Sequence, residues 1–211
     1  MGYVLKADIR HYFDTVDHEV LLGIIERKIK DRAVFLLIRK ILENYKNPVQ
    51  GKGMSIGNLT SQFFANVYLN ELDQFVKHKL KARCYIRYVD DFVILHRDKN
   101  ILQKWKNELN IFLKEKLMLE LHPEKSRLIS IKRGVTFLGF RIFPKYRLLK
   151  KSNSGRIWKR LEKFKQKYEK GEINRSEVLQ SLEGWLAYAK FADTYKFRKR
   201  VIAKFNGLFP I

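Results

Sequence analysis

The order of apolar and polar positions along the chain predicts an alternation of short strands and amphipathic helices. Residues 3–9 form a short apolar run of strand length. Residues 17–29 and 34–42 carry apolar side chains at helical spacing, with Asp17 as the expected N-cap of the first helix. After a glycine-containing loop, residues 59–80 repeat apolar positions every three or four residues, which predicts a long amphipathic helix.

The middle of the chain continues the same alternation. Residues 86–96 read as a hairpin of β-branched and aromatic residues with an Asp-Asp pair at its bend. A helix is expected over 100–117, followed by a loop and by short strands at 127–131 and 135–143. This alternation of helices and short strands indicates an α+β fold.

The pattern changes after residue 150. Lys and Arg then far outnumber Asp and Glu, and aromatic residues recur between them. A solvated helix face would explain the charge alone, whereas the aromatics indicate that these helices also pack. We therefore expect a second, helical and basic subdomain.

Composition identifies the expected partner. The chain has 44 Lys and Arg against 22 Asp and Glu, a formal net charge of +22, and such a surface attracts polyanions, nucleic acid first. An anionic membrane surface is the alternative, but no apolar run is long enough to span a bilayer and no signal peptide opens the chain. The expectation is a cytoplasmic protein without a membrane partner.

The single cysteine excludes further classes of protein. Cys84 has no second cysteine with which to form an internal disulfide or a zinc cluster. A disulfide-rich secreted scaffold and a zinc finger are therefore disfavoured. We expect Cys84 to be a small buried hydrophobe beside a strand.

Three carboxylates are expected to meet in one place. Asp8 ends the first strand, and Asp90 and Asp91 form the bend of the hairpin, so pairing of these strands would bring them together. Two carboxylates about 4 Å apart repel by roughly 4 kcal/mol at an effective dielectric of about 20. Hard divalent cations relieve that repulsion, and two Mg²⁺ ions suit phosphoryl-transfer chemistry.

The segments around these carboxylates occur as an ordered series. YVDD at 88–91 is preceded by DIRHYFDTVDH at 8–18, and the two resemble motifs C and A of reverse transcriptases. The later motifs of that family follow in order: SIGNLTSQFFANVYLNELD resembles motif B, LHPEKSRLI motif D, VTFLGF the primer grip (motif E), and SLEGWLAYAKFADTYKFRKRV the thumb of group II intron and diversity-generating retroelement enzymes. The resemblance covers nearly the whole chain.

The resemblance implies roles for individual residues. Asp8 and Asp90 would ligate two Mg²⁺ ions, for which Mn²⁺ is the expected substitute, with support from Asp91 and the backbone carbonyl of Ile9. Lys125 would protonate the pyrophosphate leaving group. The catalytic set is therefore Asp8, Asp90, Asp91 and Lys125.

The same resemblance implies how nucleotide and primer are held. Phe13 stands where the family places the aromatic ring that excludes a ribose 2′-hydroxyl, so the product should be DNA. The other expected nucleotide-binding residues are Ile56, Gly57, Ser61 and Gln62. The expected primer grip consists of Phe137, Leu138, Gly139 and Phe140, where a glycine allows a backbone to approach closely.

Motif B suggests a subclass. Group II intron and retroviral enzymes place Gln before the glycine and Pro after the serine, whereas this chain has Ile56 and Gln62 there. That pattern resembles diversity-generating retroelements, whose enzymes copy RNA with frequent errors opposite adenine and commonly bind an accessory protein. Ile56 removes an amide beside the nascent pair, which would weaken base discrimination.

The predicted organisation is a polymerase right hand without fingers. The palm would occupy residues 1–133, the primer-grip strands 134–150 and the helical thumb 151–211. The expected partners are an RNA template, a DNA primer and deoxynucleoside triphosphates. Two alternatives stay open: a truncated fragment that binds nucleic acid without polymerising, and a two-metal nuclease, which would share the carboxylates but explain neither Phe13 nor the primer grip.

Overall fold

The computed structural model describes residues 2–45 and 47–210. The chain divides into two compact units, the first ending at Ser130 and the second beginning at Ile131. Antiparallel sheets and helices are both present, which confirms the α+β prediction. Among the described helices, none combines the length and the apolar character that crossing a bilayer demands.

The first unit is built on a four-stranded antiparallel sheet with strand order β2-β3-β1-β4. Its strands are β1 (Tyr3–Asp8), β2 (Cys84–Tyr88), β3 (Asp91–His96) and β4 (Arg127–Ser130). β1 lies in the centre between β3 and β4, so its carboxyl end reaches the tight turn that joins β2 to β3. The predicted strands at 3–9 and 86–96 are confirmed.

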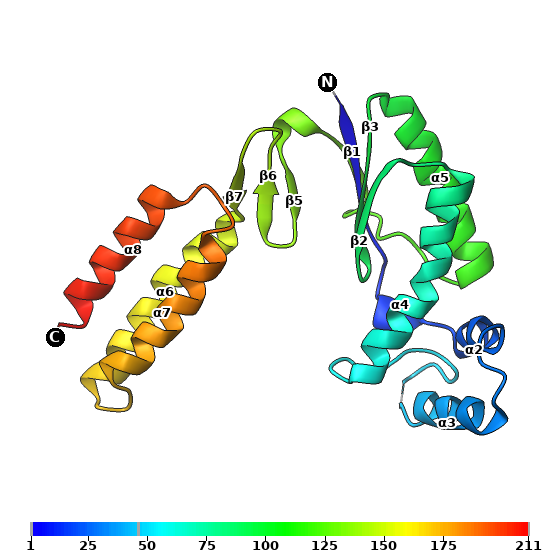
Figure 1. The fold of residues 1–211 in the computed structure, drawn as a ribbon, viewed down its shortest axis with the longest axis horizontal. Coiled ribbons are helices and arrows are strands. Elements are labelled where there is room, and N and C mark those ends of the chain that lie inside the picture. Colours follow the sequence, from blue (N-terminus) through cyan, green and yellow to red (C-terminus); the bar gives the residue numbers. More distant parts are fainter. Residues whose placement is uncertain (1, 46, 211) are drawn as a thin grey trace. The chain divides into compact units, whose positions relative to one another are not determined.

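Helices pack against this sheet and against one another (Figure 1). They are α1 (Tyr12–Thr15), α2 (His18–Glu26), α3 (Arg32–Glu43), α4 (Leu59–Gln74), which continues in a π-helical turn over Phe75–Lys79, and α5 (Lys99–Leu117). Leu5 and Ile94 of the sheet and Leu72 of α4 are completely buried between the layers. On β2, by contrast, Ile86 and Tyr88 are more than half exposed, so that strand keeps an open face.

Three helices of the first unit, α2, α3 and α5, begin after a capping aspartate. The Asp17 carboxylate accepts a hydrogen bond from the Val20 backbone N–H at 3.1 Å, as predicted for the first residue outside α2. Asp31 and Asp98 cap α3 and α5 in the same way. The one-turn helix α1 was not predicted, because four residues leave no periodic pattern to detect.

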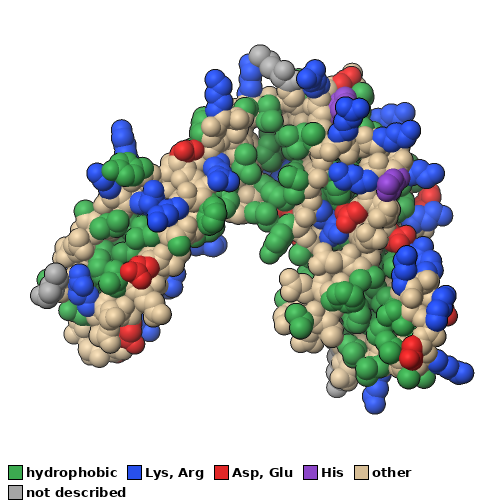
Figure 2. Space-filling model, in the orientation of Figure 1, with side chains coloured by type: hydrophobic (Ala, Val, Ile, Leu, Met, Phe, Trp, Pro, Cys, Tyr) green, Lys and Arg blue, Asp and Glu red, His purple; other side chains and the backbone are tan. Residues whose placement is uncertain are grey.

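The second unit combines a small sheet with three helices. Strands β5 (Val135–Phe137), β6 (Phe140–Ile142) and β7 (Arg147–Leu149) pair antiparallel in that order, and α6 (Lys151–Glu169), α7 (Arg175–Ala189) and α8 (Tyr195–Leu208) follow. Buried residues from these helices form a separate core that includes Leu161, Leu182 and Phe205. Lys and Arg side chains are spread over the visible faces of both units (Figure 2).

Two expectations need correction. The strand expected over 135–143 is a hairpin, because Leu138 and Gly139 both have positive φ (47° and 84°) and turn the chain back. Cys84 is exposed, not buried. It lies on β2, an edge strand on which exposed and half-buried residues alternate.

Candidate active site

The central strand pair brings the three aspartates to one end of the sheet. Asp8, the last residue of β1, pairs in register with Asp91, the first residue of β3. Asp90 occupies the turn before β3, and its backbone carbonyl accepts a hydrogen bond from the Ile9 N–H at 3.2 Å. The predicted juxtaposition of strand end and hairpin bend is therefore present.

Two lysines lie against these carboxylates. Lys125 Nζ is 3.1 Å from Asp8 Oδ1, and Lys6 Nζ is 3.5 Å from Asp91 Oδ1. Burial raises the pKa of Asp90, with a further contribution from the Asp8 charge and an opposing one from Lys125. Burial likewise raises the pKa of Asp91, which Lys6 opposes and the other two carboxylates reinforce. The three carboxylates therefore act on one another electrostatically.

The chemistry of this cluster suits a hard divalent cation. Asp91 Oδ1 is buried without a hydrogen-bond partner, although Lys6 stands at ion-pair distance, and a group left in that condition favours an added cation. Within the described residues, no group of three or more His, Cys, Asp or Glu side chains is arranged so that it could hold a metal ion as it stands. Lys125 is 55% exposed and Asp8 16%, so the lysine has freedom to leave the carboxylate.

A serine that the sequence analysis missed supports the first aspartate. Ser126 is 1% exposed, and its hydroxyl accepts a hydrogen bond from the Asp8 N–H at 3.3 Å and lies 3.2 Å from the Asp8 carbonyl. The His122 N–H donates to the same carbonyl at 2.8 Å. These bonds fix the loop that carries Lys125 to the end of β1. A serine in a polar loop gives no signal of this role in a single sequence.

The segment around Phe13 is tied to the loop that precedes α4. Phe13 lies on α1, half-buried, with its ring edge-on to Tyr12 at a centroid distance of 5.4 Å. Its carbonyl accepts a hydrogen bond from the Met54 N–H, and the Val16 carbonyl accepts one from Gly53. The structure thus joins predicted motif A to the residues that directly precede predicted motif B.

The predicted nucleotide-binding residues differ in exposure. Ile56 is 75% exposed, and Gly57 has a φ of 101°, which favours glycine. Gln62 is exposed on the first turns of α4, whereas Ser61 is 6% exposed and faces the core. The structure therefore leaves Ile56, Gly57 and Gln62 accessible and Ser61 largely enclosed.

The predicted primer-grip residues form the β5–β6 turn. Leu138 is 46% exposed at the tip. A Cβ on Gly139 would collide with Tyr188 and Asn153, whose side chains both hydrogen-bond to the Gly139 carbonyl at 3.3 Å. The close packing of Gly139 against α6 and α7 therefore explains why a glycine stands at this position. The sequence alone did not reveal this packing.

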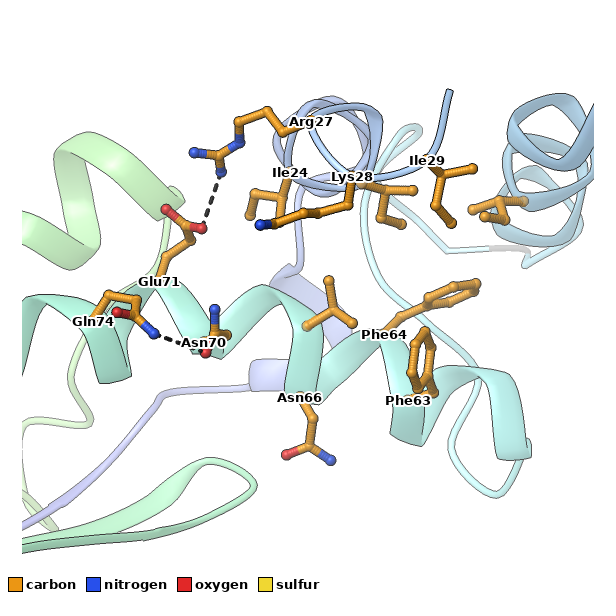
Figure 3. A pocket seen from close by; sticks show the side chains of 13 residues that line it. Ile24, Arg27, Lys28, Ile29, Phe63, Phe64, Asn66, Asn70, Glu71 and Gln74 are labelled. Atoms are coloured by element: carbon orange, nitrogen blue, oxygen red, sulfur yellow. Dashed lines mark hydrogen bonds and ion pairs between the residues drawn. The ribbon is translucent and has the colours of Figure 1, made fainter. Parts of the chain in front are cut away.

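A groove of about 990 Å³ lies between α2 and α4 (Figure 3). Its lining includes Ile24, Ile29 and Phe63, and an ion pair between Arg27 and Glu71 crosses it at 3.0 Å. None of the predicted site residues lines this groove. The candidate active site is instead the open end of the sheet.

Comparison with known proteins places this architecture in a family. A family model described as reverse transcriptase (RNA-dependent DNA polymerase) matches residues 2–142. The group II intron-encoded protein LtrA of Lactococcus lactis is 27% identical over 66% of this chain and 35% of its own length. The protein YkfC of Escherichia coli is 26% identical over 68% of this chain and 47% of its own length, and the putative COX1/OXI3 intron 2 protein of Saccharomyces cerevisiae is 25% identical over 72% and 26%. The chain spans between about a quarter and a half of these relatives.

Solved structures agree on the fold. Telomerase from Candida albicans, in complex with a TWJ fragment of telomeric RNA, aligns with a TM-score of 0.56 at 14% identity, over 100% of this chain and 44% of that chain. Apo telomerase from Candida tropicalis, truncated from the C-terminal domain, aligns with a TM-score of 0.52 at 19% identity, over 67% and 34%. This likeness indicates the right-hand polymerase fold, and the family match covers more than half of the sequence. The chain belongs to the reverse transcriptase family, and its relatives include a group II intron-encoded protein.

Proposed function

We propose that this protein is an RNA-directed DNA polymerase that adds deoxynucleotides to a primer on an RNA template. The observation that carries the proposal is the pairing of Asp8 with Asp91, with Asp90 in the adjoining turn. In the reaction the primer 3′-hydroxyl attacks the α-phosphate of the nucleotide, and pyrophosphate leaves. Asp8, Asp90 and Asp91 would hold two Mg²⁺ ions, which when bound would activate the attacking hydroxyl and stabilise the charge of the leaving group.

The chain's own residues bind and orient the metal ions, the nucleotide and the template-primer. Asp8, Asp90, Asp91 and the Ile9 carbonyl are the proposed metal-binding groups. Phe13 limits the space under the sugar, and the turn from Phe137 to Phe140 contacts the primer. The basic helices after residue 150 hold the duplex through its phosphates without selecting sequence.

Primer extension tests the proposal directly. The protein is incubated with an RNA template, a labelled DNA primer, deoxynucleotides and Mg²⁺, and lengthened primer is the expected product. Tight binding of the template-primer without extension would favour the fragment that only binds nucleic acid. Shortening of the labelled strand would favour the two-metal nuclease.

Lys125 is expected to act as the acid for the leaving pyrophosphate. The ion pair between Lys125 Nζ and Asp8 Oδ1, at 3.1 Å, supports this role because Asp8 is one of the proposed metal-binding groups. General acid catalysis contributes about 10²–10⁴-fold, so Lys125→Ala should lower the single-turnover extension rate about a hundredfold. Lys99→Ala, at an exposed position of α5, serves as the matched control. An unaltered rate for Lys125→Ala would remove this residue from the mechanism.

Ile56 is the residue on which the proposed retroelement subclass depends. Its side chain is 75% exposed in the loop before α4, and an amide there would restore a donor and an acceptor beside the nascent pair. In Ile56→Gln, misincorporation opposite template adenine should fall severalfold. Leu59→Gln, at another exposed position, controls for the polar substitution. Equal error rates in wild type and Ile56→Gln would exclude Ile56 as a major determinant of fidelity. Within the same proposal, a retroelement accessory protein is a further expected partner.

A further inference from the structure

The turn that presents Asp90 contains a strained residue. Val89 has a φ of 54°, in the left-handed region. A β-branched side chain is rarely tolerated there, and such a conformation costs about 1–3 kcal/mol unless its surroundings hold it. Val89 is also partly buried against the core, so its side chain is engaged as well as its backbone. The turn therefore needs a structural partner that keeps it in place.

Arg87 provides that partner from the strand leading into the turn. Its side chain is only 9% exposed, and its Nη1 donates a hydrogen bond to the Val89 carbonyl at 3.0 Å. The same guanidinium donates through Nε to Asp73 Oδ1 at 2.7 Å and through Nη2 to Asp73 Oδ2. A guanidinium has the planar fork needed to make these bonds at once, whereas an ammonium does not.

These bonds connect the turn to α4. Asp73 and Asn66 both belong to α4, and Asn66 Oδ1 accepts from Arg87 Nη1 at 3.3 Å. Figure 3 shows Asn66 pointing away from the α2 side of the helix. Tyr85 Oη also donates to Asp73 Oδ1, at 2.6 Å, which fixes the carboxylate further. The helix whose first turns follow Ile56 and Gly57 is thereby bonded to the turn that carries Asp90.

We propose that Arg87 is a positioning residue for nucleotidyl transfer, which holds the strained Val89 turn so that Asp90 and Asp91 keep their place opposite Asp8. Its kinetic consequence rests on the proposed polymerase function, whereas its effect on the turn does not. The side-chain hydrogen bonds of Arg87 go to Asp73, Asn66 and the Val89 carbonyl. It acts by fixing the backbone of the turn against α4, and small displacements of reacting groups lower rates steeply.

The experiment compares the effect of Arg87→Lys in three backgrounds. The backgrounds are wild type, Val89→Ala and Val89→Gly, where Ala removes most of the valine side chain but keeps the left-handed penalty, and Gly removes both. Each is assayed for kcat and KM of the nucleotide in primer extension. Hydrogen exchange of the amides at 88–91, measured by mass spectrometry, reports on the turn independently of activity.

We expect Arg87→Lys to lower kcat about tenfold or more, with little change in KM, in the wild-type and Val89→Ala backgrounds. In Val89→Gly the same substitution should cost less than about threefold, because glycine adopts the turn without help. Exchange at 88–91 should accelerate in the first two backgrounds only. An equal loss in all three backgrounds, or no loss of kcat in wild type, would overturn the proposal. If the wild-type chain does not extend primers, the proposed function fails, and the exchange pattern still decides whether Arg87 holds the turn.

Discussion

Asp90→Asn is expected to abolish primer extension on RNA, with a loss of at least about a hundredfold. The amide keeps the shape of the side chain but removes the charge that would hold a divalent cation beside Asp8 and Asp91. Metal ions contribute several kcal/mol of transition-state stabilisation, and each 1.4 kcal/mol or so is a factor of ten in rate. Rates are measured under single-turnover conditions with Mg²⁺ and again with Mn²⁺.

Glu124→Gln is the matched control, because it makes the same carboxylate-to-amide change in the exposed loop next to Lys125. Thermal unfolding adds a readout that needs no turnover. Divalent cations should raise the unfolding midpoint of the wild-type protein and raise that of Asp90→Asn much less. Extension that survives in Asp90→Asn would contradict the proposed mechanism.

Without divalent cations the same variant should be more stable than wild type. The pKa of Asp90 is higher in the folded protein than its ordinary value, chiefly through burial. Folding therefore favours the protonated acid, and this contribution is lost as pH rises from the ordinary pKa through the raised one. At neutral pH the charged carboxylate lowers the free energy of unfolding, and asparagine removes that charge. The midpoint in EDTA at pH 7 should be higher for Asp90→Asn, and the difference should shrink on acidification.

Phe13→Ala is expected to reduce the preference for deoxynucleotides over ribonucleotides by about a hundredfold. The ring lies on α1, half-buried, in a segment that bonds through its backbone to the loop before α4. Removing the ring opens space for a 2′-hydroxyl. If the lost clash is worth about 2.7 kcal/mol, the selectivity ratio changes about a hundredfold. The measurement is the ratio of kcat/KM for a deoxynucleotide to that for its ribonucleotide.

A structural effect of the same substitution must be separated from selectivity. Phe13 packs edge-on against Tyr12, so truncation also loosens the core. Phe13→Tyr keeps an aromatic ring at the site and should retain the preference for deoxynucleotides. An unchanged ratio in a folded Phe13→Ala protein would mean that another residue selects the sugar.

The long helices and the central strands were accessible from sequence because their patterns extend over several turns or a whole buried run. Asp17 was readable as a cap since its chemistry is local to the helix it begins. The strand over 135–143 was mispredicted because its apolar residues continue through the turn, and only the positive φ of Leu138 and Gly139 reveals the reversal. Pattern alone does not report that conformation.

The candidate active site, too, was only partly predictable from the sequence. Asp8 and Asp91 were expected to meet, and the sheet register brings them together. The supporting contacts of Ser126 and Arg87 were missed, because each joins segments that are far apart in the chain. A single sequence holds no information on which distant partner a loop serine or a strand arginine will meet.

The exposure of Cys84 has a practical consequence. It is the only cysteine in the chain, and it lies accessible on β2, the strand that leads to the turn of Asp90. A maleimide dye or nitroxide will therefore attach at one defined position without any cysteine having to be removed. Binding of template, primer and nucleotide can then be followed spectroscopically in the natural sequence, from a label on the strand that carries the candidate active site.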